Sequence, residues 1–446
     1  MLVVSDLWAR YGNGDWILRG LSLSLRDGEV GLIIGDTGSG KTTLVKALAG
    51  VIHLTGGLAK GIIRVDGVEL SNLKPRERSR LIGVLYQDPA IHFVYPRIGE
   101  DLELTAIENG VKVKDLLNIA GLGNEVLGKL VTELSMGQLQ RLAVAKLVTR
   151  GVKVIVMDEP LAHLDQDAAE SLVTLIRRIK RDNVSILILE HRYGQIIDSV
   201  DKALQLNNGK LSELTNLSAL PRRRYVIEGV GNSNNDGWLK LSNVWFKYDD
   251  SYVLRGINLS ASSSRVIFIG PNGGGKSTLL KLILGAIKPS RGKVTVDYSR
   301  PVLYMPQDIN MVMSMADTVG ELYIELAKAA GRNASVSDLE RELKALEMNI
   351  NTTDDPLHLS EGQKRMLMLI MAKLLKPALM IIDEPTSGLS SRYAFELAEF
   401  INQSNLRVVV ATQDMHFASL IRDSDIFYVR GWEGYVVKVK VSEHVL

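Results

Sequence analysis

The chain has 446 residues, which is too long for one ordinary hydrophobic core, so we expect two domains. Its 53 basic and 51 acidic residues nearly balance, so the composition gives no electrostatic reason to expect nucleic acid or a membrane surface as a partner. Cysteine is absent, which excludes disulfides, thiolate zinc sites, iron–sulfur clusters and a thiol nucleophile.

Neither an export signal nor a membrane span is visible in the sequence. Residues 1–11 contain no basic leader and no apolar stretch of the length that a signal peptide needs. The longest apolar runs, such as 184–189 and 378–382, are far shorter than the ~20 residues that span a bilayer. We therefore expect a cytoplasmic protein whose apolar runs are buried parallel strands.

An apolar strand over 30–34 leads into a phosphate-binding loop with the pattern Gly, four residues, Gly, Lys and a hydroxyl residue. Its glycines let backbone N–H groups face an anion, and a helix expected to begin at Thr42 adds the positive end of its dipole. The lysine can reach the outer phosphates of a nucleotide, and the hydroxyl can reach Mg²⁺. The candidate ATP-binding residues here are Gly35, Asp36, Thr37, Gly38, Ser39, Gly40, Lys41, Thr42 and Thr43.

Further along, a strand over 154–157 ends in Asp158, Glu159 and Pro160. The aspartate can hold Mg²⁺ through water, and the glutamate can polarise the water that attacks a γ-phosphate. A helix cap is the structural alternative for such a pair. A helical pattern over 166–181 and an apolar strand over 185–189 follow, and this alternation predicts a mostly parallel sheet flanked by helices.

The same landmarks return in the second half at a nearly constant offset, so the chain is an internal duplication with a repeat of domain size. An apolar strand over 266–269 precedes a second phosphate-binding loop, and a later strand ends in Asp383, Glu384 and Pro385. Two copies of the acidic pair at one offset argue against a mere cap. The candidate ATP-binding residues of the second loop are Gly270, Pro271, Asn272, Gly273, Gly274, Gly275, Lys276, Ser277 and Thr278.

The stretch between the halves is rich in arginine, glycine and asparagine, which favour turns and disorder. We predict a first domain over 1–220, a linker over 221–237 and a second domain over 238–446. The arginine run at 222–224 is interpreted as a solvated flank, with a binding patch as the alternative.

Leu134-Ser-Met-Gly-Gln138 and Leu359-Ser-Glu-Gly-Gln363 each precede a basic, apolar helical segment. These pentads resemble the signature motif of ABC-type ATPases, and the resemblance covers nearly the whole chain. It implies an α/β fold of two tandem P-loop ABC domains, each with a mostly parallel sheet and flanking helices, an antiparallel β subdomain and a helical signature subdomain. It also implies an intramolecular pseudo-dimer that sandwiches two ATP molecules. The signature residues then complete the site of the opposite half: Ser135, Gly137, Ser360 and Gly362.

The resemblance assigns further residues to the two sites. Gln87 and Gln307 match the family's Q-loop, which touches Mg²⁺ and faces a transmembrane partner. Tyr11 and Tyr248 stand where the family places an aromatic ring on adenine, with core packing as the alternative. The implied metal-binding residues are Thr42, Gln87, Asp158, Ser277, Gln307 and Asp383.

The two halves differ where the resemblance places a switch histidine, which can hydrogen-bond the γ-phosphate. The first half has His191 there, whereas the second half has Gln413. The loop after the acidic pair ends in Asp165 in the first half and in Ser390 in the second. We expect the first site to hydrolyse ATP faster, although Ser390 belongs to the partner loop of that site. The candidate catalytic residues are Glu159, His191, Glu384 and Gln413.

Residues 87–102 also resemble the energy-coupling-factor (ECF) branch of importers, with departures at His92, Phe93 and 97–98. This resemblance implies a subunit at the inner face of the cell membrane whose ATP hydrolysis drives import of a vitamin or transition-metal ion. A transmembrane T component and a substrate-binding S component would be its partners, and no nucleic acid is expected. The alternatives are a soluble twin-ABC ATPase acting on ribosomes, which usually has a long charged linker, and a nucleotide sensor without turnover.

Overall fold

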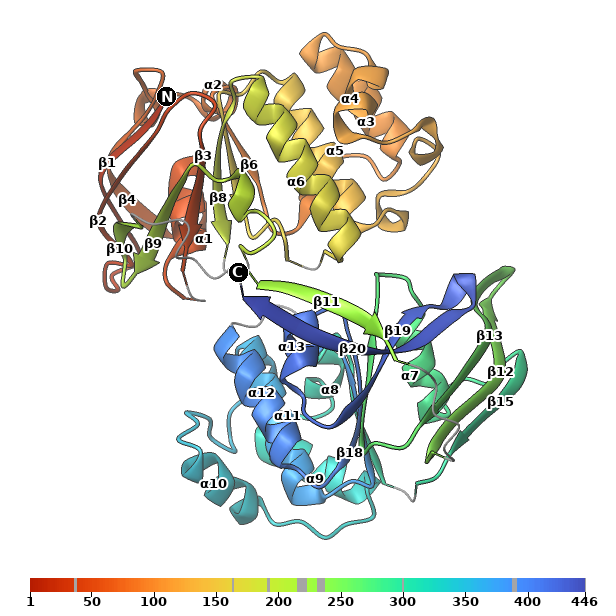
Figure 1. Ribbon diagram of the computed structural model, residues 1–446. Helices are drawn as coiled ribbons and strands as arrows, with labels where there is room; N and C mark the ends of the chain where they lie inside the picture. Colours follow the sequence, from red (N-terminus) through yellow and green to blue (C-terminus); the bar gives the residue numbers. More distant parts are fainter. Residues whose placement is uncertain are drawn as a thin grey trace. The chain divides into compact units, whose positions relative to one another are not determined.

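The computed structural model describes residues 1–35, 38–162, 164–190, 193–214, 223–230, 237–298, 301–386 and 391–445. The chain forms two compact units, one from Met1 to Arg222 and one from Arg223 to Val445 (Figure 1). Each unit contains a mostly parallel sheet and an antiparallel sheet. The predicted α/β architecture is therefore confirmed in both halves.

The central sheet of the first unit has the strand order β10-β9-β3-β8-β7-β6. All neighbours pair in parallel except β9 and β10, which form an antiparallel hairpin. The inner strands are apolar on both faces because helices cover both sides of the sheet. The strands are β3 (Val30–Ile34), β6 (Ile82–Leu85), β7 (Val154–Asp158), β8 (Ser185–Glu190), β9 (Lys202–Asn207) and β10 (Lys210–Leu214).

A second, antiparallel sheet with the order β2-β1-β4-β5 packs across α1 (Lys41–Ala49) from the central sheet. Leu44 and Val45 of α1 share one buried cluster with residues of both sheets. This cluster fixes the start of α1, and with it the phosphate-binding loop, against two sheets at once. The strands are β1 (Leu2–Tyr11), β2 (Leu18–Leu25), β4 (Gly57–Val65) and β5 (Val68–Glu69).

On the other face of the central sheet lie α5 and α6, while α3 and α4 pack on the far side of α5 (Figure 1). The second cluster, which α3, α4 and α5 share, is the core of the predicted helical signature subdomain. The helices are α2 (Pro75–Arg78), α3 (Ile98–Asn109), α4 (Val113–Ala120), α5 (Met136–Thr149) and α6 (Gln166–Arg181). The bounds of α6 are those predicted from the sequence.

The second unit repeats this plan. Its central sheet has the order β11-β20-β19-β14-β18-β17-β16, and its antiparallel sheet has the order β13-β12-β15. The strands are β11 (Arg223–Gly229), β12 (Leu239–Tyr248), β13 (Ser251–Ala261), β14 (Arg265–Ile269), β15 (Arg291–Val296), β16 (Val302–Met305), β17 (Leu379–Asp383), β18 (Arg407–Thr412), β19 (Ser424–Arg430) and β20 (Tyr435–Val445).

The helices of the second unit lie in equivalent places, with α7 beside the antiparallel sheet and α11 and α12 on the opposite face of the central sheet (Figure 1). They are α7 (Lys276–Leu284), α8 (Asn310–Met313), α9 (Val319–Ala329), α10 (Val336–Ala345), α11 (Glu361–Leu375), α12 (Ser391–Gln403) and α13 (Met415–Leu420). In each half, the strand that ends at the acidic pair lies next to the strand that precedes the candidate switch residue.

The predicted linker over 221–237 is wrong in its first part. Residues 223–229 form β11, which pairs antiparallel with β20 over its whole length, from Arg223 opposite Val445 to Gly229 opposite Val439. Ile227 also packs against the core of the second unit. Turn-favouring composition misled the prediction because the short apolar run at 225–227 is stabilised by a partner more than 200 residues away.

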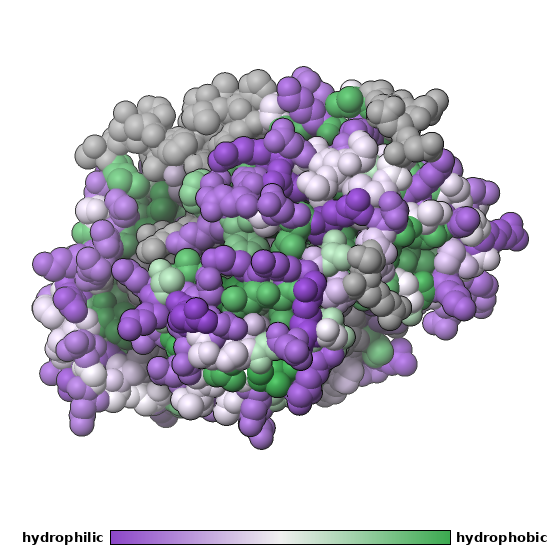
Figure 2. All heavy atoms as spheres, turned by 90° about the horizontal axis from the view of Figure 1, so that it is seen from below, coloured by the Kyte–Doolittle hydropathy of each residue, from purple (hydrophilic) through white to green (hydrophobic). Residues whose placement is uncertain are grey.

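Most of the surface drawn in Figure 2 is hydrophilic, and apolar side chains appear there as small separate patches. Such a mixture is normal for a protein surface in contact with water. Among the described residues, no helix combines the length and the apolar character that crossing a bilayer requires.

Candidate ATP-binding sites

The second phosphate-binding loop adopts a backbone path that requires glycine at two positions. Gly270 has a φ of 150°, and a Cβ atom there would lie 2.4 Å from the carbonyl oxygen of Val429. Gly275, at the N-cap of α7, has a φ of 91°, and a Cβ atom would lie 2.6 Å from Leu254 Cδ2. Gly40 caps α1 in the same left-handed conformation. Asp36 and Thr37 of the first loop lie outside the described residues.

The loop lysines are buried and contact both the loop and the candidate catalytic glutamate. Lys41 Nζ donates to Gly35 O at 2.7 Å and lies 3.3 Å from Glu159 Oε1. Lys276 Nζ donates to Gly270 O at 2.9 Å and lies 3.5 Å from Glu384 Oε1. In each half the ammonium group therefore lies between the loop and the carboxylate, where a phosphate would compete for it.

The first hydroxyl of each helix is paired with the aspartate of the acidic pair. Ser277 Oγ donates to Asp383 Oδ1 at 3.1 Å, and Thr42 makes the equivalent hydrogen bond to Asp158. Burial, followed by the charge of Glu159, raises the pKa of Asp158 to about 6. Burial likewise raises the pKa of Asp383.

The oxygen atoms of these pairs fit Mg²⁺. Within the described part of the chain, Asp158 Oδ1 is buried and takes no hydrogen bond. A hydroxyl and a carboxylate are hard oxygen donors, and Mg²⁺ commonly uses one or two such protein ligands together with substrate phosphates. Thr42 with Asp158, and Ser277 with Asp383, are thus placed to serve as the predicted metal-binding pairs.

The two candidate catalytic glutamates share an unusual backbone conformation. Glu159 has a φ of 46° and Glu384 a φ of 45°, a left-handed conformation that costs about 1–3 kcal/mol outside glycine. Each backbone N–H donates to the neighbouring strand, Glu159 N to Leu189 O at 2.9 Å and Glu384 N to Ala411 O at 2.8 Å. Burial raises the pKa of Glu384, which Lys276 opposes. The strained turn directs each carboxylate back towards the loop lysine.

The signature serines are N-caps of the signature helices. Ser135 Oγ accepts a hydrogen bond from Gln138 N at 3.3 Å, while Ser135 N donates to Gln138 Oε1 at 3.0 Å. Ser360 and Gln363 make the same capping box at the start of α11. Each serine accepts through its lone pairs, so its hydroxyl hydrogen can still be donated to an anion. The Ser-x-x-Gln spacing was a readable signal that the sequence analysis did not use.

The signature glycines allow close helix packing within each unit. A Cβ atom on Gly137 would lie 2.8 Å from Ala168 Cβ, and one on Gly362 would lie 3.1 Å from the ring of Tyr393. The prediction that these residues also complete the ATP site of the opposite half stays a prediction.

The other residues that the resemblance assigned lie at the edges of the sites. Gln87 and Gln307 lie two residues after the strands that end at 85 and 305, and both are exposed. Tyr11 is half-buried, with Lys46 Nζ 5.5 Å from its ring centre. Tyr248 is exposed and contacts the ring of Phe246 edge to face, with 4.9 Å between the centres. The structure therefore leaves the ring of Tyr248 more accessible to a nucleotide base than that of Tyr11.

At the switch position of the second half, Gln413 N donates to Glu384 Oε2 at 3.1 Å. Its side-chain oxygen is buried and has no hydrogen-bond partner among the described residues. His191 lies outside the described residues, but Glu190 before it is buried and accepts a hydrogen bond from Leu161 N at 3.1 Å. Asp165 caps α6 by accepting from Ala168 N at 2.9 Å, and Ser390 lies outside the described residues.

Two further charged groups were missed by the sequence analysis. Arg365 of α11 is buried and donates to the backbone carbonyls of Gln307 and Glu384. Lys146 of α5 is buried and forms an ion pair with Asp101 of α3. Both cations lie within apolar helical segments. A charged residue in such a segment was the sequence signal that could have identified them.

The fold and the paired sites define a tandem ATPase with two P-loop domains. A family model described as ABC transporter matches residues 18–162 and 254–387, which is more than half of the chain. The chain belongs to the ABC transporter family, and it is an ATPase with two ABC domains.

Relatives span nearly the whole chain at low identity. A protein of Streptomyces coelicolor is 26% identical, covering 97% of this chain and 92% of its own length. One of Treponema denticola is 27% identical, with 94% and 93% covered. Both are named as proposed ABC transporter ATP-binding proteins.

Solved structures are alike in fold. A model of ribosome-bound archaeal Pelota and ABCE1 contains a chain with a TM-score of 0.68 and 20% identity, covering 98% of this chain and 78% of that one. The archaeal ribosome recycling factor aABCE1, in complex with the stalk protein aP1, gives 0.65 and 21%, covering 97% and 89%. At these identities the likeness shows the fold alone.

Proposed function

We propose that this ATPase energises a membrane transporter. The observation that carries the proposal is an exposed apolar segment directly after the first Q-loop glutamine. Ile91, Val94 and Tyr95 are 59%, 78% and 43% exposed, although they lie beside a well-packed helical subdomain. Large apolar side chains that cluster on a surface mark an interaction site. We name residues 91–95 the apolar loop.

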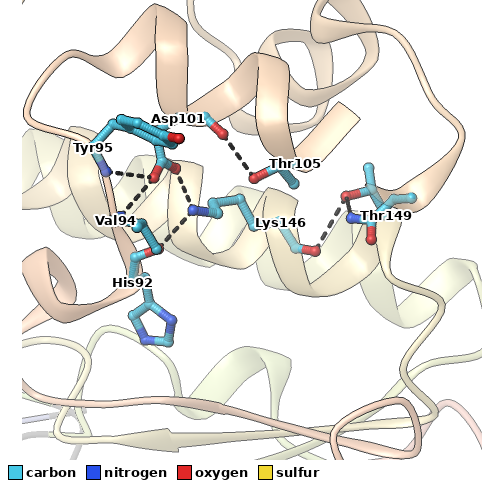
Figure 3. Close-up of polar contacts among 8 residues, drawn as sticks. His92, Val94, Tyr95, Asp101, Thr105, Lys146 and Thr149 are labelled. Carbon is cyan, nitrogen blue, oxygen red and sulfur yellow. Dashed lines mark hydrogen bonds and ion pairs between the residues drawn. The ribbon is translucent and has the colours of Figure 1, made fainter. Parts of the chain in front are cut away.

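The apolar loop is held in place by a buried ion pair (Figure 3). Lys146 Nζ contacts Asp101 Oδ1 and donates to His92 O at 2.6 Å. Asp101 Oδ2 accepts from Val94 N at 2.7 Å and from Tyr95 N at 3.3 Å. The loop is therefore presented as a fixed surface, which reduces the entropy lost when a partner binds.

The second half presents a smaller equivalent. Met311 and Met315, which follow Gln307, are both strongly exposed. Methionine adapts its shape to a partner surface at little cost. A helix of a transmembrane T component, apolar on one side, is the partner that we propose for these surfaces.

The chemistry follows from the residues of each site. The loop N–H groups and Lys41 or Lys276 would bind the phosphates, and Glu159 or Glu384 would accept a proton from the attacking water and hold it in line. Mg²⁺, held by Thr42 with Asp158 and Ser277 with Asp383, would neutralise the charge of the β- and γ-phosphates. Glu159 and Glu384 are released from the loop lysines when phosphate takes their place.

We further propose that the transporter is of the ECF type, on the resemblance of residues 87–102. In that case the solute, a vitamin or transition-metal ion, would be bound by a separate S component. The chain would then lie on the inner face of the cell membrane. The names of the relatives support a transporter, and neither those names nor the fold distinguishes the ECF branch.

The proposal is tested by measuring how much purified chain binds to washed membrane vesicles and to ribosomes from the source organism. The variant V94D/Y95D should lose membrane binding because it places charge on the apolar loop. The matched control is L54D, since Leu54 is 73% exposed and lies outside the loop. Both variants should retain ATPase activity. Binding of the wild type to ribosomes and not to membranes would favour the twin ATPase of translation and reject the transporter.

A further inference from the structure

The guanidinium group of Arg365 connects two functional segments of the second unit. Its side chain is 3% exposed and projects from the second turn of the signature helix α11. Nη1 donates to the backbone carbonyl of Glu384 at 3.3 Å, and Nη2 donates to the backbone carbonyl of Gln307 at 3.2 Å. One side chain thus binds the candidate catalytic glutamate and the Q-loop glutamine together.

The first unit has a different residue at this position. Ser135 and Ser360 cap the two signature helices, and the fifth residue after each is Gln140 in α5 and Arg365 in α11. Gln140 is fully buried, and neither its amide oxygen nor its amide nitrogen has a partner among the residues that the structure describes. The first unit therefore lacks the link through this position.

The link acts on a peptide whose orientation matters. Glu384 has a φ of 45°, and its N–H is held by Ala411 O. Arg365 holds the carbonyl on the other side of the same residue, so the direction of the carboxylate is fixed from both ends. The equivalent N–H of Glu159 is held by Leu189 O, while the Glu159 carbonyl accepts from Ala162 N at 3.0 Å and not from the Gln140 side chain.

A buried guanidinium is held strongly by its acceptors. Hydrogen bonds from a charged donor are stronger than those from a neutral donor, and an unpaired buried charge is costly. Displacement of the Gln307 carbonyl would therefore pull on Arg365, and Arg365 would pull on Glu384. The first unit has no such charged connection between Gln87 and Glu159 through Gln140.

We propose that Arg365 is a positioning residue that couples the Q-loop of the second unit to Glu384, so that the state of Gln307 sets turnover at the second site. The inference rests on the proposed catalytic role of Glu384. It assigns to the second site a dependence on the Q-loop that the first site lacks.

The test exchanges the two residues in full-length chains in which one site at a time is inactivated. In an E159Q chain, where turnover reports the second site, R365Q should lower kcat about tenfold, or about 1.4 kcal/mol, with KM for ATP changed less than twofold. R365K keeps the charge but cannot hold both carbonyls as a fork does, and should be intermediate. If R365Q does not fold, R365K carries the test.

Two comparisons separate coupling from a merely structural role. Q307A and R365Q should be non-additive in kcat in the E159Q chain, because both break the same connection. In the E384Q chain, Q140R and R365Q should leave kcat of the first site unchanged. Additive effects of Q307A and R365Q, or an unchanged kcat in R365Q, would overturn the inference. Turnover absent from E159Q but present in E384Q would instead reject a catalytic Glu384.

Discussion

At the scale of single residues, the left-handed glutamates show how the sites store strain. Glu159 and Glu384 adopt nearly the same φ, and each precedes a proline, which disfavours such a conformation, so the conformation belongs to the site and not to local propensity. A carboxylate is needed at a place where the backbone would favour glycine. The hydrogen bonds to Leu189 O and Ala411 O of the neighbouring strands offset the cost of this conformation.

Because of this strain, we expect the inactive glycine variant at position 384 to be more stable than the inactive alanine variant. E384G should unfold at higher temperature than E384A, by the equivalent of about 1 kcal/mol, because glycine tolerates positive φ and alanine does not. Both variants should lose turnover at the second site. Thermal unfolding of the two chains measures the difference. An alanine variant at least as stable as the glycine variant would show that the turn is not strained.

His92 gives the fold a dependence on pH. Burial, with the charge of Lys146 as a second cause, lowers the pKa of His92 to about 4. The unfolded chain binds this proton near pH 6.5, so the free energy of unfolding should fall as the pH drops from about 6.5 to about 4, by up to about 3 kcal/mol. Above pH 6.5 the stability is fully present. Denaturant unfolding at pH 7.5 and pH 5 measures the loss, which the uncharged variant H92Q should reduce.

The sequence predicted the residues whose chemistry is written in a short motif. Each acidic pair lies at the end of a strand and each signature serine at the start of a helix, because these positions depend on residues close in sequence. Their roles in ATP binding and hydrolysis stay predictions. Arg365 could not be assigned, since its acceptors are backbone carbonyls 19 and 58 positions away. The positive φ of Glu159 could not be predicted from the sequence either, because the local sequence does not favour it.

At the scale of elements, the two units use different chemistry at equivalent positions of the signature subdomain. Asp101 is the fourth residue of α3 and Lys146 the eleventh of α5, where they form the buried ion pair. The fourth residue of α9 is Leu322 and the eleventh of α11 is Met371, and both are fully buried. Two apolar side chains of one buried cluster therefore stand in place of the ion pair in the second unit.

Exchanging these residues separates stability from loop positioning. D101L and K146M should each destabilise the chain by about 3–5 kcal/mol, because each leaves one charge buried without its partner. The double variant D101L/K146M copies the second unit and should recover most of that stability. Denaturant unfolding of the four chains completes the cycle. A double variant as unstable as the two single losses combined would mean that the pair itself stabilises the subdomain.

The same double variant should release the apolar loop. Val94 N and Tyr95 N lose their acceptor when Asp101 is removed, so their amide hydrogens should exchange faster, while ATP hydrolysis by the purified chain is retained. Hydrogen exchange of the peptide containing residues 91–97 measures this. Unchanged protection in a folded double variant would show that the loop is held by other contacts.

Most helices and strands were predicted well from the sequence. The largest errors were at the ends of these elements and in which strands or side chains pair with each other. Helix α6 has the predicted bounds, whereas α1 begins one residue earlier than expected, at the loop lysine. A helix end depends on the conformation of the residue before it, here a left-handed glycine, and this does not follow from periodicity. The ion pair of Asp101 was hidden because its partner is 45 positions away.

At the scale of the whole molecule, the two halves are unequal because the second unit has an additional strand, β11, ahead of the residues that repeat the first unit. A fragment of residues 223–446 should fold, and a fragment of 238–446 should melt several degrees lower, since it lacks β11 and exposes the edge of β20. Thermal unfolding of the two fragments tests this. Equal melting temperatures would mean that residues 223–229 add no stability to the second unit and act only as a linker.

The pairing of β11 with β20 also determines the order of events during synthesis. β11 leaves the ribosome more than 200 residues before its partner, which is a delay of roughly 10–40 s at ordinary rates of translation. Throughout that interval a strand with no neighbour must avoid pairing with other chains. Glu228 supplies a charge of the kind that natural edge strands use against such association. The second domain thus completes its sheet only when the last residues of β20 have been made.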